Sequence, residues 1–196
     1  MKFNSLIIYW SGTGNTEKVA NAIRKGMERV GLKPTIKRIE DAKSEELLDY
    51  DFVCLGSPSH MFLPAEPVLR FIREKITDYA KRGFIKPCAP KVPGKYAVVF
   101  CTYSGPHTGI DEAIPAGKHM RQFLEHIGFE VIAEWYVVGE FHGNELLSTK
   151  GKLGNIKGRP NTQDLACVEE DTVKIANKLL KEIKPQNNSF LDKNRH

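Results

Sequence analysis

Apolar residues along the chain follow two alternating patterns. Five short runs are apolar almost throughout, which is typical of strands buried on both faces of a sheet. These runs cover residues 3–10, 35–39, 52–56, 96–102 and 130–138. Between the runs, apolar residues recur at helical spacing, which predicts amphipathic helices. The predicted helices cover residues 16–30, 45–50, 67–79, 114–126 and 162–183. This alternation predicts a doubly wound α/β fold, in which a five-stranded parallel sheet carries helices on both faces.

Three segments lie outside this alternation. Residues 81–94 contain three prolines and two glycines, which predicts an irregular, exposed connection. Residues 139–159 form a glycine- and lysine-rich connection before the last helix, and loops of this length are usually functional or mobile. The polar segment 185–196 is expected to be a flexible tail. One domain over residues 1–184 remains, a common size for a single core.

Composition narrows the classes of partner. The net charge is +5, but acidic and basic residues are interleaved, and we expect no nucleic-acid partner. Residues 150–159 are locally basic, as either a solvated loop or a contact for a phosphate-bearing partner. No apolar run reaches the length of a membrane span and residues 1–3 lead directly into a strand, so a cytoplasmic location is predicted.

Cysteines and histidines do not indicate a metal site or a disulfide framework. Cys54, Cys88, Cys101 and Cys167 are widely spaced, and no two histidines have metal-ligand spacing. Cys54 and Cys101 fall inside apolar strand patterns, which predicts that both are buried packing groups. We therefore expect no bound metal.

The clearest chemical signal is a polar, glycine-containing turn between the first strand and the first helix. It consists of Ser11, Gly12, Thr13, Gly14, Asn15 and Thr16. The glycines leave room for an anion, the hydroxyl and amide side chains offer neutral donors, and the following helix offers free N–H groups. The turn lacks the Gly-x-x-x-x-Gly-Lys-Ser/Thr and Gly-x-Gly-x-x-Gly patterns, which disfavours nucleotide hydrolysis and a standard dinucleotide fold. Phosphate binding or helix capping alone are the remaining interpretations.

Residues 9–18, with the sequence YWSGTGNTEK, resemble the FMN-phosphate loop of flavodoxins. The order of predicted elements is similar to that family along nearly the whole chain, up to residue 184. The resemblance implies a sheet order of 2-1-3-4-5, with FMN at the carboxyl ends of strands one, three and four.

The resemblance assigns the isoalloxazine ring of FMN to the loops after the third and fourth strands. The candidate residues there are Ser57, Pro58, Ser59, His60, Met61, Phe62, Thr102, Tyr103, Ser104, Gly105, His107 and Gly109. Tyr103, His60, Met61 and Phe62 are candidates for stacking on the ring, whereas Met61 and Phe62 could instead fill the core beneath the loop. His60 and His107 are either hydrogen-bond or proton donors, with a possible catalytic role, or solvated loop residues.

Two features depart from classical flavodoxins. Those proteins are typically acidic, whereas this chain has a net charge of +5. Their third-strand loop usually carries a glycine whose peptide flips to bond reduced flavin and stabilise its one-electron-reduced form, but residues 59–63 contain no glycine. A non-glycine residue enters the left-handed region at a cost of about 1–2 kcal/mol, so this form should be less favoured.

Residues 56–59, Gly-Ser-Pro-Ser, with the aromatic-containing loop that follows, resemble NAD(P)H:quinone oxidoreductases and FMN reductases of the same fold. That resemblance implies an FMN-dependent oxidoreductase that uses NAD(P)H as donor and a quinone or similar acceptor. Two alternatives stay open: an electron carrier between redox proteins, and a flavin-binding module whose loop 139–159 contacts a protein. Segments 81–94 and 139–159 are also candidate interfaces of a homo-oligomer.

Overall fold

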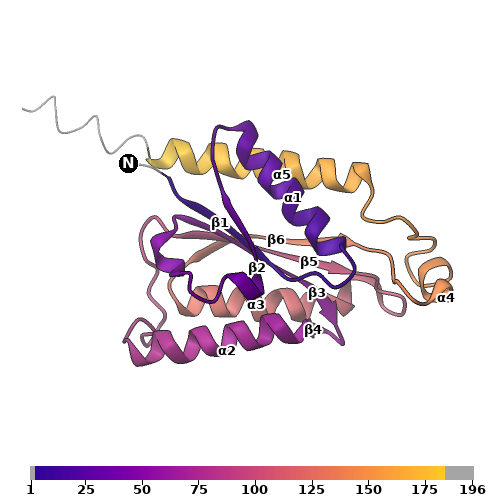
Figure 1. Cartoon of the computed structure of the whole chain (residues 1–196), viewed down its shortest axis with the longest axis horizontal. Coiled ribbons are helices and arrows are strands. Elements are labelled where there is room, and N and C mark those ends of the chain that lie inside the picture. Colours follow the sequence, from indigo (N-terminus) through magenta and orange to yellow (C-terminus); the bar gives the residue numbers. More distant parts are fainter. Residues whose placement is uncertain (1–2, 184–196) are drawn as a thin grey trace, which may run out of the picture.

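A single parallel sheet organises the chain, and the computed structural model describes residues 3–183. Its strands lie in the order β2-β1-β3-β5-β6 (Figure 1). They are β1 (Ser5–Tyr9), β2 (Thr35–Arg38), β3 (Phe52–His60), β5 (Tyr96–Tyr103) and β6 (Glu130–Val138). Counted along the chain as five strands, this is the expected order 2-1-3-4-5, so the predicted topology is confirmed. The tail predicted over residues 185–196 lies outside the described residues.

Helices cover both faces of the sheet, as predicted. Helices α1 (Asn15–Arg29) and α5 (Thr162–Ile183) lie on one face, and α2 (Glu66–Lys81) and α3 (Ile114–His126) lie on the other (Figure 1). Each helix places an apolar stripe against the sheet and its charged residues outward. Among residues 3–183, none of the helices is both long and apolar enough to span a membrane.

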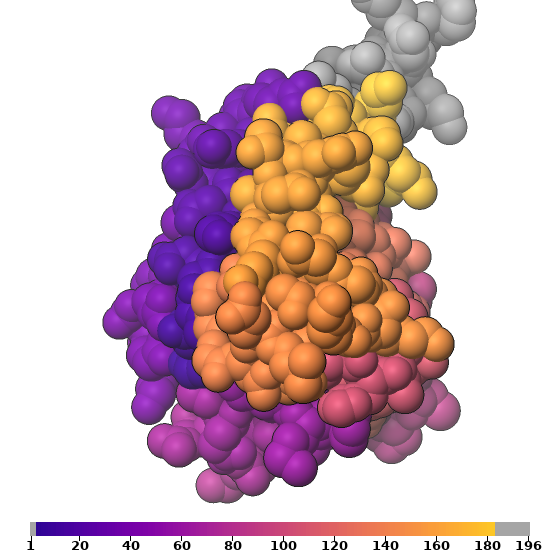
Figure 2. Space-filling view, turned by 90° about the vertical axis from the view of Figure 1, so that its right-hand side faces the viewer, coloured from indigo at the N-terminus to yellow at the C-terminus, as the bar shows by residue number. Residues whose placement is uncertain are grey.

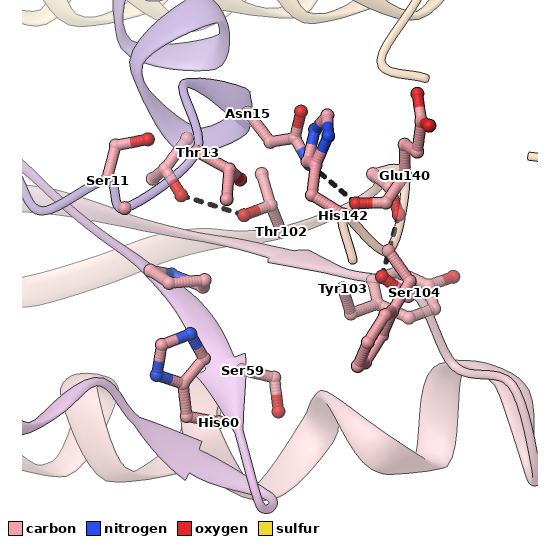
Figure 3. Close-up of a pocket in the computed structure, with 15 residues that line it drawn as sticks. Ser11, Thr13, Asn15, Ser59, His60, Thr102, Tyr103, Ser104, Glu140 and His142 are labelled. Atoms are coloured by element: carbon pink, nitrogen blue, oxygen red, sulfur yellow. Dashed lines mark hydrogen bonds between the residues drawn. The ribbon is translucent and has the colours of Figure 1, made fainter. Parts of the chain in front are cut away.

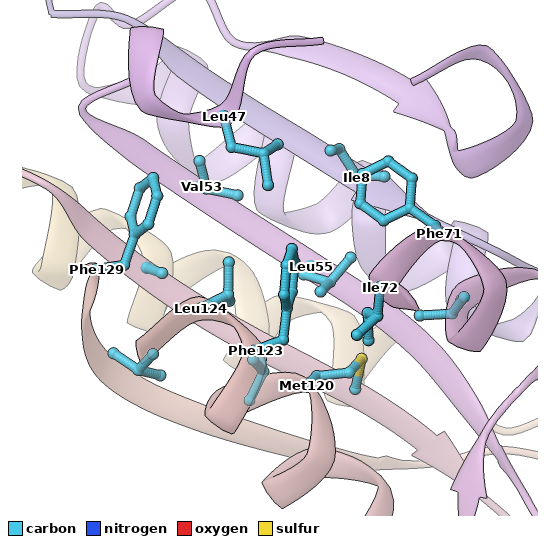
Figure 4. Packing of buried hydrophobic residues seen from close by; sticks show 14 of the residues in the cluster. Ile8, Leu47, Val53, Leu55, Phe71, Ile72, Met120, Phe123, Leu124 and Phe129 are labelled. Carbon is cyan, nitrogen blue, oxygen red and sulfur yellow. The ribbon is translucent and has the colours of Figure 1, made fainter. Parts of the chain in front are cut away.

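The core consists of two clusters, because successive side chains of a strand point to opposite faces of the sheet. Leu6 and Ile8 of β1 pack towards α2 and α3, whereas Ile7 packs towards α1 and α5. Figure 4 shows the first cluster, where residues of β1 and β3 meet the aromatic rings of α2 and α3. Each fully buried aliphatic or aromatic side chain contributes about 1.5–3 kcal/mol. The strands are therefore apolar almost throughout because both of their faces are buried.

The cysteines of the central strands are packing groups, as predicted. Cys54 lies in the cluster facing α1 and α5, and Cys101 lies in the cluster facing α2 and α3. Burial raises the pKa of the Cys101 thiol to about 12, so this thiol stays protonated and unreactive at neutral pH. Within the described residues, no cluster of three or more histidine, cysteine or acidic side chains could hold a metal ion.

The helix predicted over residues 45–50 is wrong. The connection between β2 and β3 contains only two 3₁₀ turns, η1 (Ile39–Asp41) and η2 (Leu47–Asp49). Leu47 is the only buried residue of η2, and its backbone N–H donates to the hydroxyl of the buried Tyr79 at 3.0 Å. One buried residue cannot provide the continuous apolar stripe that a longer helix needs.

Two further connections differ in their degree of order. Residues 82–95 contain no helix or strand, which agrees with the irregular segment predicted there. The long connection 139–159 contains the short helix α4 (Glu145–Thr149), and hydrogen bonds join it to the loop after β5. It is therefore a folded part of the structure at the carboxyl edge of the sheet.

Close packing of the two central strands gives a test of the fold. A Cβ atom added at Gly56 would lie 2.1 Å from the ring of Phe100, its partner across the β3–β5 pairing. We predict that Gly56→Ala lowers the free energy of unfolding in urea by roughly 1–3 kcal/mol through overpacking. Because the clash is with one ring, the double variant with Phe100→Leu should lose less than the sum of the two single losses. Additive losses would contradict this explanation.

Candidate functional site

The carboxyl ends of β1, β3 and β5 surround a cavity of about 340 Å³ (Figure 3). Cavities of this size and larger commonly bind small molecules and cofactors. Predicted site residues from all three segments line it, namely Ser11, Gly12, Thr13, Asn15, Thr16, Pro58, Ser59, His60, Thr102, Tyr103 and Ser104. Parallel strands end at the same edge of a sheet, so three turns distant in sequence meet there.

The first wall is the turn between β1 and α1. Gly14 immediately precedes α1 with φ 92°, and its N–H donates to the Ser11 hydroxyl at 3.1 Å. The first helical bond is from Lys18 N–H to the Gly14 carbonyl, so the N–H groups of the preceding turn have no acceptor within the helix. These groups and the helix dipole favour an anion at this end of the cavity.

Two neighbouring side chains fix the shape of this turn. A Cβ atom at Gly12 would lie 2.9 Å from the Trp10 ring, so a larger residue there would require the indole to shift. Arg38, at the end of β2, donates to the Ser11 carbonyl at 2.9 Å. The Arg38 guanidinium therefore stabilises the turn by bonding to the backbone of Ser11, and it does not line the cavity.

Hydrogen bonds join the first turn to the other side of the site. The hydroxyls of Thr16 and Thr102 are 2.8 Å apart, and both side chains are buried. The Asn15 amide donates to the Glu140 carbonyl at 3.0 Å, and the two residues face each other in Figure 3. Its Oδ1 atom is buried and has no hydrogen-bond partner among the described residues.

The second wall is the end of β3, which extends beyond its predicted limit at residue 56 and folds back on β4 (Leu63–Pro64). Ser59 pairs with Pro64 and His60 pairs with Leu63 in this antiparallel hairpin. Ser57 lies beneath the cavity, where its buried hydroxyl accepts from Ala65 N–H at 2.9 Å. The hairpin thus presents Pro58, Ser59 and His60 to the cavity, whereas Ser57 supports it from below.

The tip of this hairpin is exposed. Met61 and Phe62 are 88% and 55% exposed, so the alternative in which both fill the core is wrong. Their φ angles are 47° and 70°, in the left-handed region that a two-residue hairpin turn requires. Both residues are therefore already in the left-handed region, whose steric cost was expected to oppose the peptide flip of a non-glycine residue. The absence of glycine consequently does not by itself disfavour the electron-carrier alternative.

His60 borders the cavity next to an indole. Its ring meets Trp10 edge to face, with centroids 5.6 Å apart. Partial burial lowers the pKa of His60, so the neutral imidazole predominates at neutral pH. A neutral ring offers one N–H donor and one nitrogen acceptor. His60 can therefore exchange a hydrogen bond with a ligand without adding charge.

The third wall is the segment after β5. Tyr103 is buried, with 9% of its surface exposed. Burial raises the pKa of its hydroxyl, so that group stays protonated. Gly109, with φ 78°, lies outside the cavity lining and closes the following turn by donating to the Gly105 carbonyl at 3.1 Å. A Cβ atom at Gly105 would lie 2.5 Å from the Gly109 carbonyl oxygen, so the turn depends on glycine there.

A second recess of about 310 Å³ adjoins the first. The two share Ser59, Tyr103, Ser104 and Phe141 as walls. Four other predicted site residues line the second recess, namely Met61, Phe62, Gly105 and His107. His60 and His107, the two candidate donors, therefore border different recesses.

A fourth wall was not predicted from the sequence. Gly139, Glu140, Phe141 and His142 follow β6 and line the first cavity. Gly139 donates to the Tyr103 carbonyl at 2.7 Å, and its own carbonyl accepts from the Ser104 hydroxyl at 2.9 Å. The carboxylate of Glu140 accepts from Gly158 N–H at 2.8 Å. One feature of the sequence could have indicated this wall. The long connection 139–159 follows the fifth predicted strand, which lies next to the fourth in the sheet, so it starts at the same carboxyl edge.

Comparison with known proteins agrees with this geometry. The family model described as Flavodoxin matches residues 7–168. A flavodoxin from Megasphaera elsdenii is 32% identical over 97 residues, a stretch that covers 50% of this chain and 63% of that protein. The matched stretch is thus less than two thirds of that relative.

A second relative has a different name. An NAD(P)H dehydrogenase (quinone) from Archaeoglobus fulgidus is 26% identical over 166 residues, covering 70% of this chain and 82% of that protein. The solved structure of a flavodoxin from the domain Archaea superposes with a TM-score of 0.62 at 18% identity, covering 91% of this chain and 99% of that one. The family match, the sheet order and the turn after β1 agree, and the chain belongs to the flavodoxin family.

Proposed function

We propose that this protein is an FMN-dependent oxidoreductase that takes electrons from NAD(P)H and passes them to a quinone or a similar small acceptor. The observation that carries the cofactor assignment is the meeting of three carboxyl-edge turns around one cavity with an anion cradle at one end. Bound FMN supplies the redox chemistry, and the protein positions its ring and adjusts its potential.

The residues of the cavity fit FMN along its length. Uncharged donors from Ser11, Thr13 and the first turn of α1 would hold the phosphate, as helix N-termini commonly do. Asn15 also lines the cavity, and its amide group would contact the ribityl chain. The segments 58–60 and 102–104 would contact the isoalloxazine ring, and the deep position of Thr16 gives it the role of holding Thr102.

The second recess supports the oxidoreductase function over that of a flavin-binding module. It opens beside the first cavity and is bordered by apolar side chains and by His107, so a flat molecule could approach a flavin bound next to it. Matches to both flavodoxins and NAD(P)H dehydrogenases (quinone) are compatible with this proposal. The net charge of +5 also differs from the acidic surface expected of a classical carrier.

A flavodoxin-type electron carrier is the second candidate. The exposed apolar tip of the β3–β4 hairpin, Met61 and Phe62 followed by Leu63, favours it, because such a surface beside a redox site suits a protein partner. The two candidates differ in what reduces the bound flavin.

Replacement of Thr13 tests the phosphate end. Thr13 is exposed at the cavity, so Thr13→Glu leaves the fold intact and places a carboxylate against the FMN phosphate. We predict that FMN affinity, measured by flavin fluorescence titration, falls roughly 100-fold or more through like-charge repulsion. Thr77→Glu near the end of α2 is the matched control and should bind FMN as the wild type does. Equal affinity of both variants would place the phosphate elsewhere. The buried Thr16 is unsuitable for this test, because its replacement would disturb the fold.

Anaerobic titration separates the two redox functions. For an oxidoreductase, we expect NADH or NADPH to bleach the flavin spectrum in one two-electron step, with turnover when a quinone is added. Reduction by dithionite alone, through a strongly populated one-electron stage and without NAD(P)H oxidation, would instead identify a carrier. A protein that takes up no FMN would exclude both functions.

A further inference from the structure

We propose that Phe141 is a further flavin-contacting residue and that Ser148 is the positioning residue that holds it at the site. The proposal rests on the FMN site described above. It assigns a function to the connection between β6 and α5. The roles proposed for the phosphate turn and the two ring segments leave this connection without one.

Phe141 occupies the boundary between the two recesses. Its side chain lines both of them, together with Ser59, Tyr103 and Ser104. FMN is elongated, so a molecule with its phosphate at the first turn and its ring against segments 58–60 and 102–104 must reach these shared walls. Of the four residues, only Tyr103 and Phe141 are aromatic, and they come from different strand ends.

The backbone of Phe141 is held more tightly than its exposed ring suggests. The Ser148 hydroxyl accepts from Phe141 N–H at 3.0 Å and donates to the Phe141 carbonyl at 3.0 Å. Ser148 itself is 1% exposed, and its carbonyl accepts from the N–H of the buried Ile156 at 2.8 Å. One side chain of α4 therefore fixes both polar groups of a residue at the cavity.

Phe141 is 40% exposed. An apolar ring whose backbone is already ordered can be covered by a ligand without further ordering of the chain. Aromatic pairs favour offset or edge-to-face contacts with another ring system. Contact with an isoalloxazine would remove this exposed apolar surface from water.

The connection after β6 lies next to the other segments that form the site. Figure 2 looks onto the carboxyl edge of the sheet, where the connection after β6, coloured orange, lies between the indigo N-terminal part and the pink segment after β5. A hydrogen bond from Lys152 N–H to the Pro106 carbonyl, 2.8 Å, joins the connection to that pink segment. The connection is thus tied to the segment after β5, and its residues 139–142 border the cavity.

Three variants of exposed phenylalanines test the contact, with flavin fluorescence titration and the rate of FMN release as readouts. Phe141→Ala should weaken FMN binding roughly threefold to tenfold and speed its release, as expected for one lost aromatic contact. Phe141→Tyr should keep both values. Phe84→Ala removes a ring of similar exposure, 42%, far from both recesses, and should also leave both unchanged.

A double-mutant cycle tests the positioning role. Ser148→Ala should speed FMN release in the same direction as Phe141→Ala, and the double variant should release FMN no faster than Phe141→Ala alone. Additive effects would mean that Ser148 stabilises the protein without acting through Phe141, and would overturn this part. Retention of wild-type FMN release by Ser148→Ala would overturn it equally.

The outcomes separate this inference from the proposed function. If the wild-type protein binds FMN but Phe141→Ala binds and releases it as the wild type does, the contact is absent while the FMN site stands. Failure of the wild-type protein to bind FMN would remove the site and the inference together.

Discussion

The parallel pairing of β1 with β3, and of β3 with β5, is the constraint on which the rest of the structure depends. Both faces of these strands are buried, so their side chains are apolar and their backbone groups must bond within the sheet. The polar site residues therefore lie at the carboxyl ends of these strands or in the turns that follow. Because parallel strands leave at one edge, the polar turns after β1, β3 and β5 are brought to one place.

Side chains hold the turns at that edge together by donating hydrogen bonds to backbone carbonyls of neighbouring segments. Arg38 supports the first turn through the Ser11 carbonyl, and Asn15 reaches across to the Glu140 carbonyl. Each such bond contributes only about 0.5–1.5 kcal/mol. Together they order segments that carry few buried apolar groups, so the cavity has a defined shape although loops form most of it.

The same edge concentrates strain and exposed apolar surface. Met61 and Phe62 adopt left-handed backbone conformations, and both side chains face solvent next to the second recess. Residues in such conformations persist only where the surrounding structure holds them, here the two-residue turn between β3 and β4. The turn thus accounts for the left-handed conformations, and it leaves both apolar side chains exposed beside the second recess.

The sequence by itself determined the alternation of strands and helices, the parallel sheet and the position of the polar turn after β1. These follow from local patterns: apolar runs, helical spacing, and the sequence from Ser11 to Thr16. The helix predicted at residues 45–50 failed because only Leu47 of η2 is buried, and its backbone N–H bonds to Tyr79 of α2, a residue far away in the sequence. Only the tertiary structure decided that Phe141 and His142 line the cavity, that His60 and His107 border different recesses, and that Ser148 holds Phe141. Such placements depend on contacts between residues far apart in the chain, which no local pattern encodes.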